Sequence, residues 1–265
     1  MLRRRNEQGE TVGNKTAILA YVDEGSDLHS VLKSRPVLDR EATALALAEL
    51  FPSHKAMPLA DGHLGSVYPP RDEVGIACYP GLTIVSAQAL IVEPSQLDQR
   101  FLEFAKGRTM LHHVTISTVD AFSYGVWKNG ELVRALSMSS DGVTEDIGAP
   151  RAVELPYWAG KYPCADDDEV DDGLVELDEH DRPEFGDDLE GSAVDRHAGS
   201  LPFHPLELGD AVLLDLFGYA LDGYDAETQL DPDSIALMRF TLRQTARQQT
   251  GSDPVVGMRP WWKFW

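Results

Sequence analysis

The chain has 265 residues, of which 43% are hydrophobic and 25% are charged, and its formal net charge is −21 at pH 7. This length is enough for a sizeable core in one large domain or two small ones. The negative charge argues against nucleic acid as a partner, because affinity for phosphate backbones depends on lysine and arginine. No stretch approaches the apolar length of a membrane span, so we expect no membrane span either.

The negative charge is concentrated in one segment. Residues 166–195 contain fifteen carboxylates and a single arginine, Arg182, so most of the net charge belongs to this part of the chain. Such a composition is poor in large apolar side chains and rarely buries enough surface to order itself. We therefore expect residues 165–200 to form an acidic, poorly ordered insert.

The first elements mix strand and helix. Residues 16–22 predict a strand, and Asp39 is a favourable N-cap for a helix that runs to Leu50. Residues 74–90 predict two strands joined by a turn at Pro80–Gly81.

A second helix follows these strands. Ser95–Asp98 has the pattern of a capping box, and Leu97, Phe101 and Phe104 then share one helical face. A cation followed by glycine, Lys106–Gly107, is typical of the end of a helix.

Residues 110–147 predict an antiparallel meander. Asn129–Gly130 is a strong signal for a two-residue hairpin, and residues 131–138 form its returning strand. Strict alternation along this strand places Arg134 on the same face as Leu132 and Leu136.

The last elements follow the acidic segment. A helix is predicted from Pro205 to the neighbourhood of Gly223, and residues 235–242 predict a final strand. Strands and helices mixed with adjacent hairpins favour an α+β fold, with a central, mainly antiparallel sheet and packed helices. We expect one such domain over residues 13–242, followed at 243–265 by a linker and an aromatic C-terminal docking peptide.

The chain shows no complete catalytic motif. Ala121–Gly125 resembles a nucleophile elbow around Ser123, but an elbow turns from a strand into a helix, and here a hairpin follows. The adjacent His112 and His113 point to opposite faces of a strand, which disfavours a shared metal ion. The sequence therefore predicts no catalytic residue, no metal and no cofactor. Its two cysteines form no CxxC pair, which fits a reducing, cytoplasmic location.

One group of polar and aromatic residues is denser in the sequence than a hydrophobic core requires. A buried charge on Arg134 would need a carboxylate partner, for which Glu145 and Glu154 are the natural choices. A structural ion pair is favoured over a ligand site. The candidate pocket consists of His112, Asp120, Trp127, Arg134, Glu145, Glu154, Trp158, His204 and Glu207.

The C-terminal segment combines aromatic rings with cations, which is typical of the anchor residues of protein interfaces. Packing against its own domain is an equally favoured interpretation. The residues that we expect to bind a partner, or to mediate self-association, are Arg259, Trp261, Trp262, Lys263, Phe264 and Trp265.

Several motifs resemble those of an actinobacterial family of uncharacterised proteins, a domain of unknown function. They lie in residues 13–17, 127–134, 145–148, 156–160 and 201–209. The resemblance implies that residues 1–12 are an upstream extension and that the acidic insert is expanded, and it transfers no catalytic residue. A weaker similarity links the hairpin at Trp127 to small immunity-type domains that act by binding another protein.

Two functions follow from these patterns. The first is a non-enzymatic cytoplasmic protein-binding module that acts through its aromatic C-terminal segment, its acidic insert, or both. The alternative is a hydrolase or transferase with a pocket around His112, Asp120, Arg134, Glu145 and His204.

Overall fold

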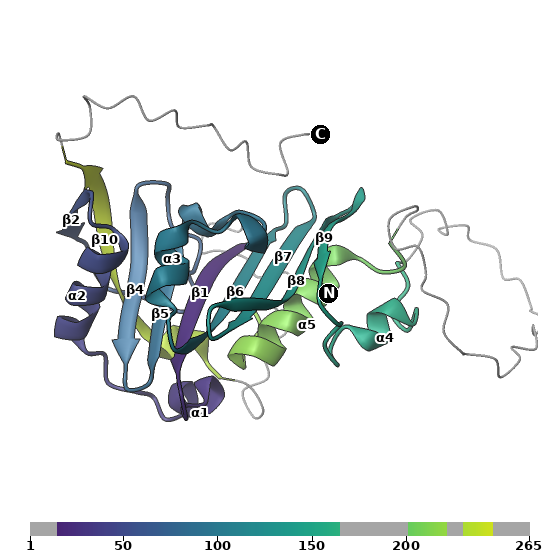
Figure 1. Cartoon of the computed structure of the whole chain (residues 1–265), viewed down its shortest axis with the longest axis horizontal. Coiled ribbons are helices and arrows are strands. Elements are labelled where there is room, and N and C mark those ends of the chain that lie inside the picture. Colours follow the sequence, from purple (N-terminus) through teal and green to yellow (C-terminus); the bar gives the residue numbers. More distant parts are fainter. Residues whose placement is uncertain (1–14, 165–200, 222–229, 246–265) are drawn as a thin grey trace, which may run out of the picture.

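The computed structural model describes residues 15–164, 201–221 and 230–245 (Figure 1). Its strands are β1 (Lys15–Asp23), β2 (His54–Pro58), β3 (Gly62–His63), β4 (Glu73–Tyr79), β5 (Leu82–Ala87), β6 (Arg108–Ile116), β7 (Ala121–Lys128), β8 (Glu131–Ser139), β9 (Gly142–Ile147) and β10 (Ala236–Gln244).

These ten strands form one sheet in the order β2-β10-β4-β5-β1-β6-β7-β8-β9, and β3 pairs with β10. Figure 1 shows β2 at one end of the sheet and β9 at the other. Every pairing of neighbouring strands is antiparallel. The prediction of an α+β fold with an antiparallel sheet is therefore confirmed.

Helices cover both faces of the sheet and enclose two hydrophobic clusters. The α5 face also carries α1 and the aromatic residues of α4, whereas the α2 face also carries α3 and the 3-10 turns η1 and η2. The helical elements are α1 (Leu28–Lys33), α2 (Arg40–Leu50), η1 (Gln88–Leu90), η2 (Pro94–Gln96), α3 (Gln99–Phe104), α4 (Leu155–Trp158), α5 (Pro205–Phe217) and η3 (Pro232–Ser234).

The central strand β1 explains why both faces must be covered. Its Ile18 and Ala20 belong to the cluster on the α5 face, while Leu19 and Tyr21 belong to the cluster on the α2 face. All four side chains are fully buried. A strand that is apolar on both faces is stable only between two layers, and the helices supply them.

The meander is confirmed, but its side-chain pattern differs from the prediction. In the ladder of β7 and β8, Val126 pairs with Arg134 and Trp127 pairs with Leu132, so the register shifts at this point. Such a bulge reverses the face of the residues beyond it. Leu132 consequently packs on the α2 face, whereas Leu136 packs on the α5 face with Arg134.

Two helix boundaries also differ from the prediction. Asp98, not Ser95, caps α3, with its carboxylate accepting a hydrogen bond from the backbone N–H of Arg100. Ser95 lies instead in η2. The last helix ends at Gly218, whose φ of 77° supplies the left-handed cap, rather than near Gly223.

Three predicted features lie outside the described residues. They are the acidic insert at 165–200, the region of Gly223 and the aromatic segment from Arg259 to Trp265. Among the helices of the described ranges, none combines the length and the apolar character that crossing a bilayer requires.

Candidate functional site

Eight of the nine residues of the predicted pocket are divided between the two faces of the sheet, and the ninth, Asp120, lies in the turn between β6 and β7. His112, Trp127 and Glu145 lie on the α2 face, where His112 bonds to the carbonyl of Leu90 and its ring contacts Trp127. The residues on the opposite face are Arg134, Glu154, Trp158, His204 and Glu207. The sheet separates the two groups, so they do not line one cavity.

On the α5 face, Arg134 and Glu154 form a buried ion pair. The guanidinium donates from Nε to Oε1 at 2.9 Å and from Nη2 to Oε2 at 2.5 Å. Glu154 is fully buried and Arg134 is 2% exposed. Of the two carboxylates expected to pair with Arg134, Glu154 does so and Glu145 does not.

The remaining bonds of this pair come from its surroundings. Glu154 also accepts hydrogen bonds from the Tyr124 hydroxyl, the Arg151 backbone N–H and the Trp158 indole. Arg134 also donates to the Asp146 carboxylate and to the carbonyls of residues 147 and 148. A buried ion pair is tolerated when such bonds satisfy its remaining donors and acceptors. This cluster joins α4 and the residues at the end of β9 to the neighbouring strand β8.

Gly148 is required by the same cluster. Its φ is +78°, and a Cβ atom at this position would lie 2.1 Å from the carbonyl oxygen of Val133. The backbone passes this close to the β8 bulge in order to present its carbonyl to Arg134. The family-like motif at 145–148 therefore has a structural explanation.

On the α2 face, Glu145 accepts fewer hydrogen bonds than Glu154 does. It is 8% exposed, its Oε1 accepts one hydrogen bond of 3.3 Å from the Ser95 backbone N–H, and its Oε2 is buried without a described partner. Burial raises the pKa of this carboxyl, while the bond from Ser95 opposes the change.

Ser123 lies within β7 and not at an elbow. Its hydroxyl is buried and lies 2.8 Å from the hydroxyl of Ser137 on β8. No histidine bonds to it among the described residues, so the geometry offers no activated nucleophile here.

At the start of α5, His204 and Asp120 approach each other. Nε2 of His204 lies 3.8 Å from Oδ1 of Asp120, and both side chains are over 40% exposed. Nδ1 of His204 accepts the backbone N–H of Leu206 and so caps the helix. Glu207 contributes its backbone carbonyl to the Tyr157 hydroxyl.

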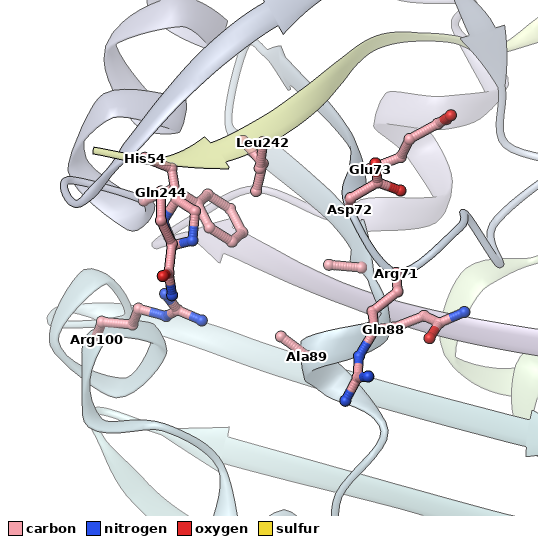
Figure 2. A pocket seen from close by; sticks show the side chains of 11 residues that line it. His54, Arg71, Asp72, Glu73, Gln88, Ala89, Arg100, Leu242 and Gln244 are labelled. Carbon is pink, nitrogen blue, oxygen red and sulfur yellow. The ribbon is translucent and has the colours of Figure 1, made fainter. Parts of the chain in front are cut away.

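A pocket of about 220 Å³ lies elsewhere, where β2, β10, β4, η1 and α3 meet (Figure 2). None of its lining residues belongs to the predicted set. They are Phe51, His54, Arg71, Asp72, Glu73, Ala87, Gln88, Ala89, Arg100, Leu242 and Gln244.

Sequence reasoning missed this pocket because its walls come from five separate stretches of chain. No motif spans them, and β2 itself was not predicted, since its sequence has no regular alternation. The position of Arg100 beside Phe101 was visible on the predicted helix, but the guanidinium also contacts the ring of Phe51, which comes from a distant stretch of chain.

Within residues 15–164, 201–221 and 230–245, no group of three or more His, Cys, Asp or Glu side chains is arranged to hold a metal ion. The described part is thus an α+β sheet protein with a tightly bonded charged cluster around Arg134 and an open pocket beside Arg100.

The chain belongs to a family of unknown function (DUF6928), whose sequence profile matches residues 16–192 and 186–240. Comparison with curated proteins and with solved structures gave no match.

Proposed function

We propose that the chain is a non-enzymatic, cytoplasmic protein-binding module of an actinobacterial family. Its partner contacts would come from the aromatic segment 259–265, from the acidic insert, or from both. The rival function, a hydrolase or transferase, would need the predicted pocket residues in one cleft, and the sheet separates them.

The observation that supports partner binding best is the surface at the β9 end of the sheet. Several large hydrophobic side chains in this part of the structure are exposed, and the last of them precedes residue 165, where the acidic insert begins, by three positions in the sequence. They are Val133, Ile147, Leu155 and Tyr162, which are 37% to 54% exposed. Exposed apolar side chains contribute to sites that bind another protein.

Charge would select the partner. The insert carries fifteen carboxylates and one arginine between residues 166 and 195, so a surface with a basic rim fits it. Complementary charge of this kind mainly raises association rates and specificity, and salt weakens it.

The test is affinity capture from a native lysate with the full chain and with a chain that ends at Met258. We expect the shorter chain to lose a partner or to stop self-associating, while its melting temperature stays the same. A second variant, with the carboxylates of 166–195 changed to amides, separates the contribution of the insert. A large fall in melting temperature with unchanged binding would show that the aromatic segment is part of the core instead.

The alternative function retains one contact, the partly exposed pair of His204 and Asp120. A general base needs a proton-accepting atom within about 2.6–3.2 Å of its partner in the reacting complex. If the His204→Ala variant lost a hydrolytic or transferase activity of the full chain, the enzyme interpretation would replace the one proposed.

A further inference from the structure

The pocket between β2, β10 and α3 contains two guanidinium groups with unused hydrogen-bond donors. Arg100 is held by the rings of Phe51 and Phe101, with its guanidinium carbon 4.9 Å and 4.7 Å from their centroids. Its only described ion pair is a contact of 3.8 Å with Asp98. No described residue accepts a hydrogen bond from the guanidinium of Arg100 or Arg71.

The two arginines approach the pocket from opposite sides. In Figure 2, Arg100 lies on the same side as His54 and Gln244, and Arg71 lies on the other side with Gln88; Ala89 lies between the arginines. Cation–π contacts with the two rings hold the Arg100 guanidinium without using its N–H groups. Such a group is pre-oriented to donate two parallel hydrogen bonds.

The carboxylates of the pocket do not neutralise this arrangement. Glu73 accepts a hydrogen bond of 2.6 Å from Arg239, which lies outside the lining. Asp72 is exposed and, in the view of Figure 2, lies on the side away from Arg100. The corner beside Arg100 is therefore a cationic part of the pocket.

We propose that this pocket binds the phosphate group of a small organic molecule. Arg100 and Arg71 would donate to the phosphate oxygens from two sides, and the amides of Gln88 and Gln244 would supply further donors. The volume of about 220 Å³ exceeds what a phosphate alone needs, and Phe51 with Leu242 offers an apolar wall for the organic part. This site is independent of the proposed partner-binding function.

Calorimetry on the full chain, in chloride buffer of constant ionic strength, tests the proposal. Inorganic phosphate should bind with a saturable 1:1 isotherm, and phenyl phosphate should bind more tightly because its ring can contact the apolar wall. Arg71→Gln should raise both dissociation constants about tenfold or more, the usual effect of losing a hydrogen bond to a charged group. Arg100→Lys should act similarly, because lysine keeps the charge and loses the planar fork.

Arg243→Gln is the matched control. It removes the same charge from an exposed position of β10 that does not line the pocket, so binding should not change. Arg71 is exposed and makes no described contact, so its variant tests the pocket without disturbing the fold. Absence of saturable heat, or equal weakening by Arg71→Gln and Arg243→Gln, would overturn the proposal. If inorganic phosphate and phenyl phosphate bound with equal affinity, the proposal that the apolar wall contacts an organic group would be wrong.

His54 gives a second readout. Burial and then the charge of Arg100 lower the pKa of its imidazole. The other charged groups of the pocket are Arg71, Asp72 and Glu73. A bound phosphate would offset the positive charge, so the pKa of His54, followed by proton NMR, should rise when phosphate is present. An unchanged pKa at saturating phosphate would place the anion elsewhere on the protein.

Discussion

Two neighbouring histidines of β6 face opposite sides of the sheet and have different environments. On the α5 face, His113 bonds through Nδ1 to the Thr16 hydroxyl and through Nε2 to the Gly209 carbonyl, both at 2.8 Å. On the α2 face, His112 donates from Nε2 to the Leu90 carbonyl, while its buried Nδ1 has no described partner.

The two acidic residues differ in the same way. Glu154 on the α5 face accepts five hydrogen bonds, whereas Glu145 on the α2 face accepts one. Charged groups on the α5 face are thus used to hold the structure together. The α2 face retains buried polar atoms without a described hydrogen-bond partner, and the pocket beside Arg100 lies on the same side. We therefore expect ligand binding on the α2 face.

The largest expected effect is a loss of stability in acid, to which both histidines contribute. Burial lowers the pKa of His112 to about 4 and that of His113 to about 3, from a usual value of 6.5. Below pH 6.5 the unfolded chain then binds more protons than the folded one, so stability present above pH 6.5 is lost as the pH falls. The loss should reach about 1.4 kcal/mol per pH unit for each histidine, roughly 4 kcal/mol for both at pH 5.

Urea unfolding between pH 7 and pH 5 measures this slope. His112→Gln, which can still donate to the Leu90 carbonyl, should halve it. A stability that stays constant over this range would mean that the two rings are not buried as described.

The second effect, of similar size, comes from the charged cluster of Arg134 and Glu154. Glu154→Gln leaves Arg134 buried with Asp146 as its one described carboxylate partner. The loss of one partner of a buried ion pair costs about 3–5 kcal/mol when the other charge is left unpaired, so we expect a cost up to that size. Arg151→Ala is the matched control, because Arg151 begins the same turn and pairs with Asp215 in a partly exposed ion pair. Its loss should cost at most about 1 kcal/mol. Equal effects of the two variants in urea unfolding would show that the cluster is solvated.

Local patterns predicted much of this fold. The Asn129–Gly130 hairpin, the meander and the first and last strands are confirmed, because each depends on residues close together in the chain. The strand β2 and helix α1 were missed. β2 is a strand because β10, nearly 200 residues later, pairs with it through Phe240 to Gln244.

The site was predicted less well than the fold, for a physical reason. The need of Arg134 for a carboxylate followed from its position, and Glu154 meets that need. The bulge at Val126–Trp127 was not visible in the alternation, so Leu132 was assigned to the wrong face. The pocket depends on packing between distant segments, and no local spacing records it.

The smallest expected effect is a gain in stability, opposite in sign to the loss expected for Glu154→Gln. Glu145→Gln keeps an oxygen that can accept from the Ser95 N–H and removes a charge from a buried position. Since burial raises the pKa of Glu145 in the folded chain, its ionisation destabilises the fold as the pH rises from the unfolded value through the folded one. The variant should therefore be more stable than the natural chain at pH 7, by about 1 kcal/mol, a typical cost of a poorly satisfied buried polar group. The gain should be smaller at pH 5, where the natural carboxyl is more protonated.

Urea unfolding of the Glu145→Gln and Glu154→Gln variants side by side gives the comparison directly. If both variants are destabilised at pH 7, Glu145 has a partner of its own and the two faces of the sheet do not differ as we infer.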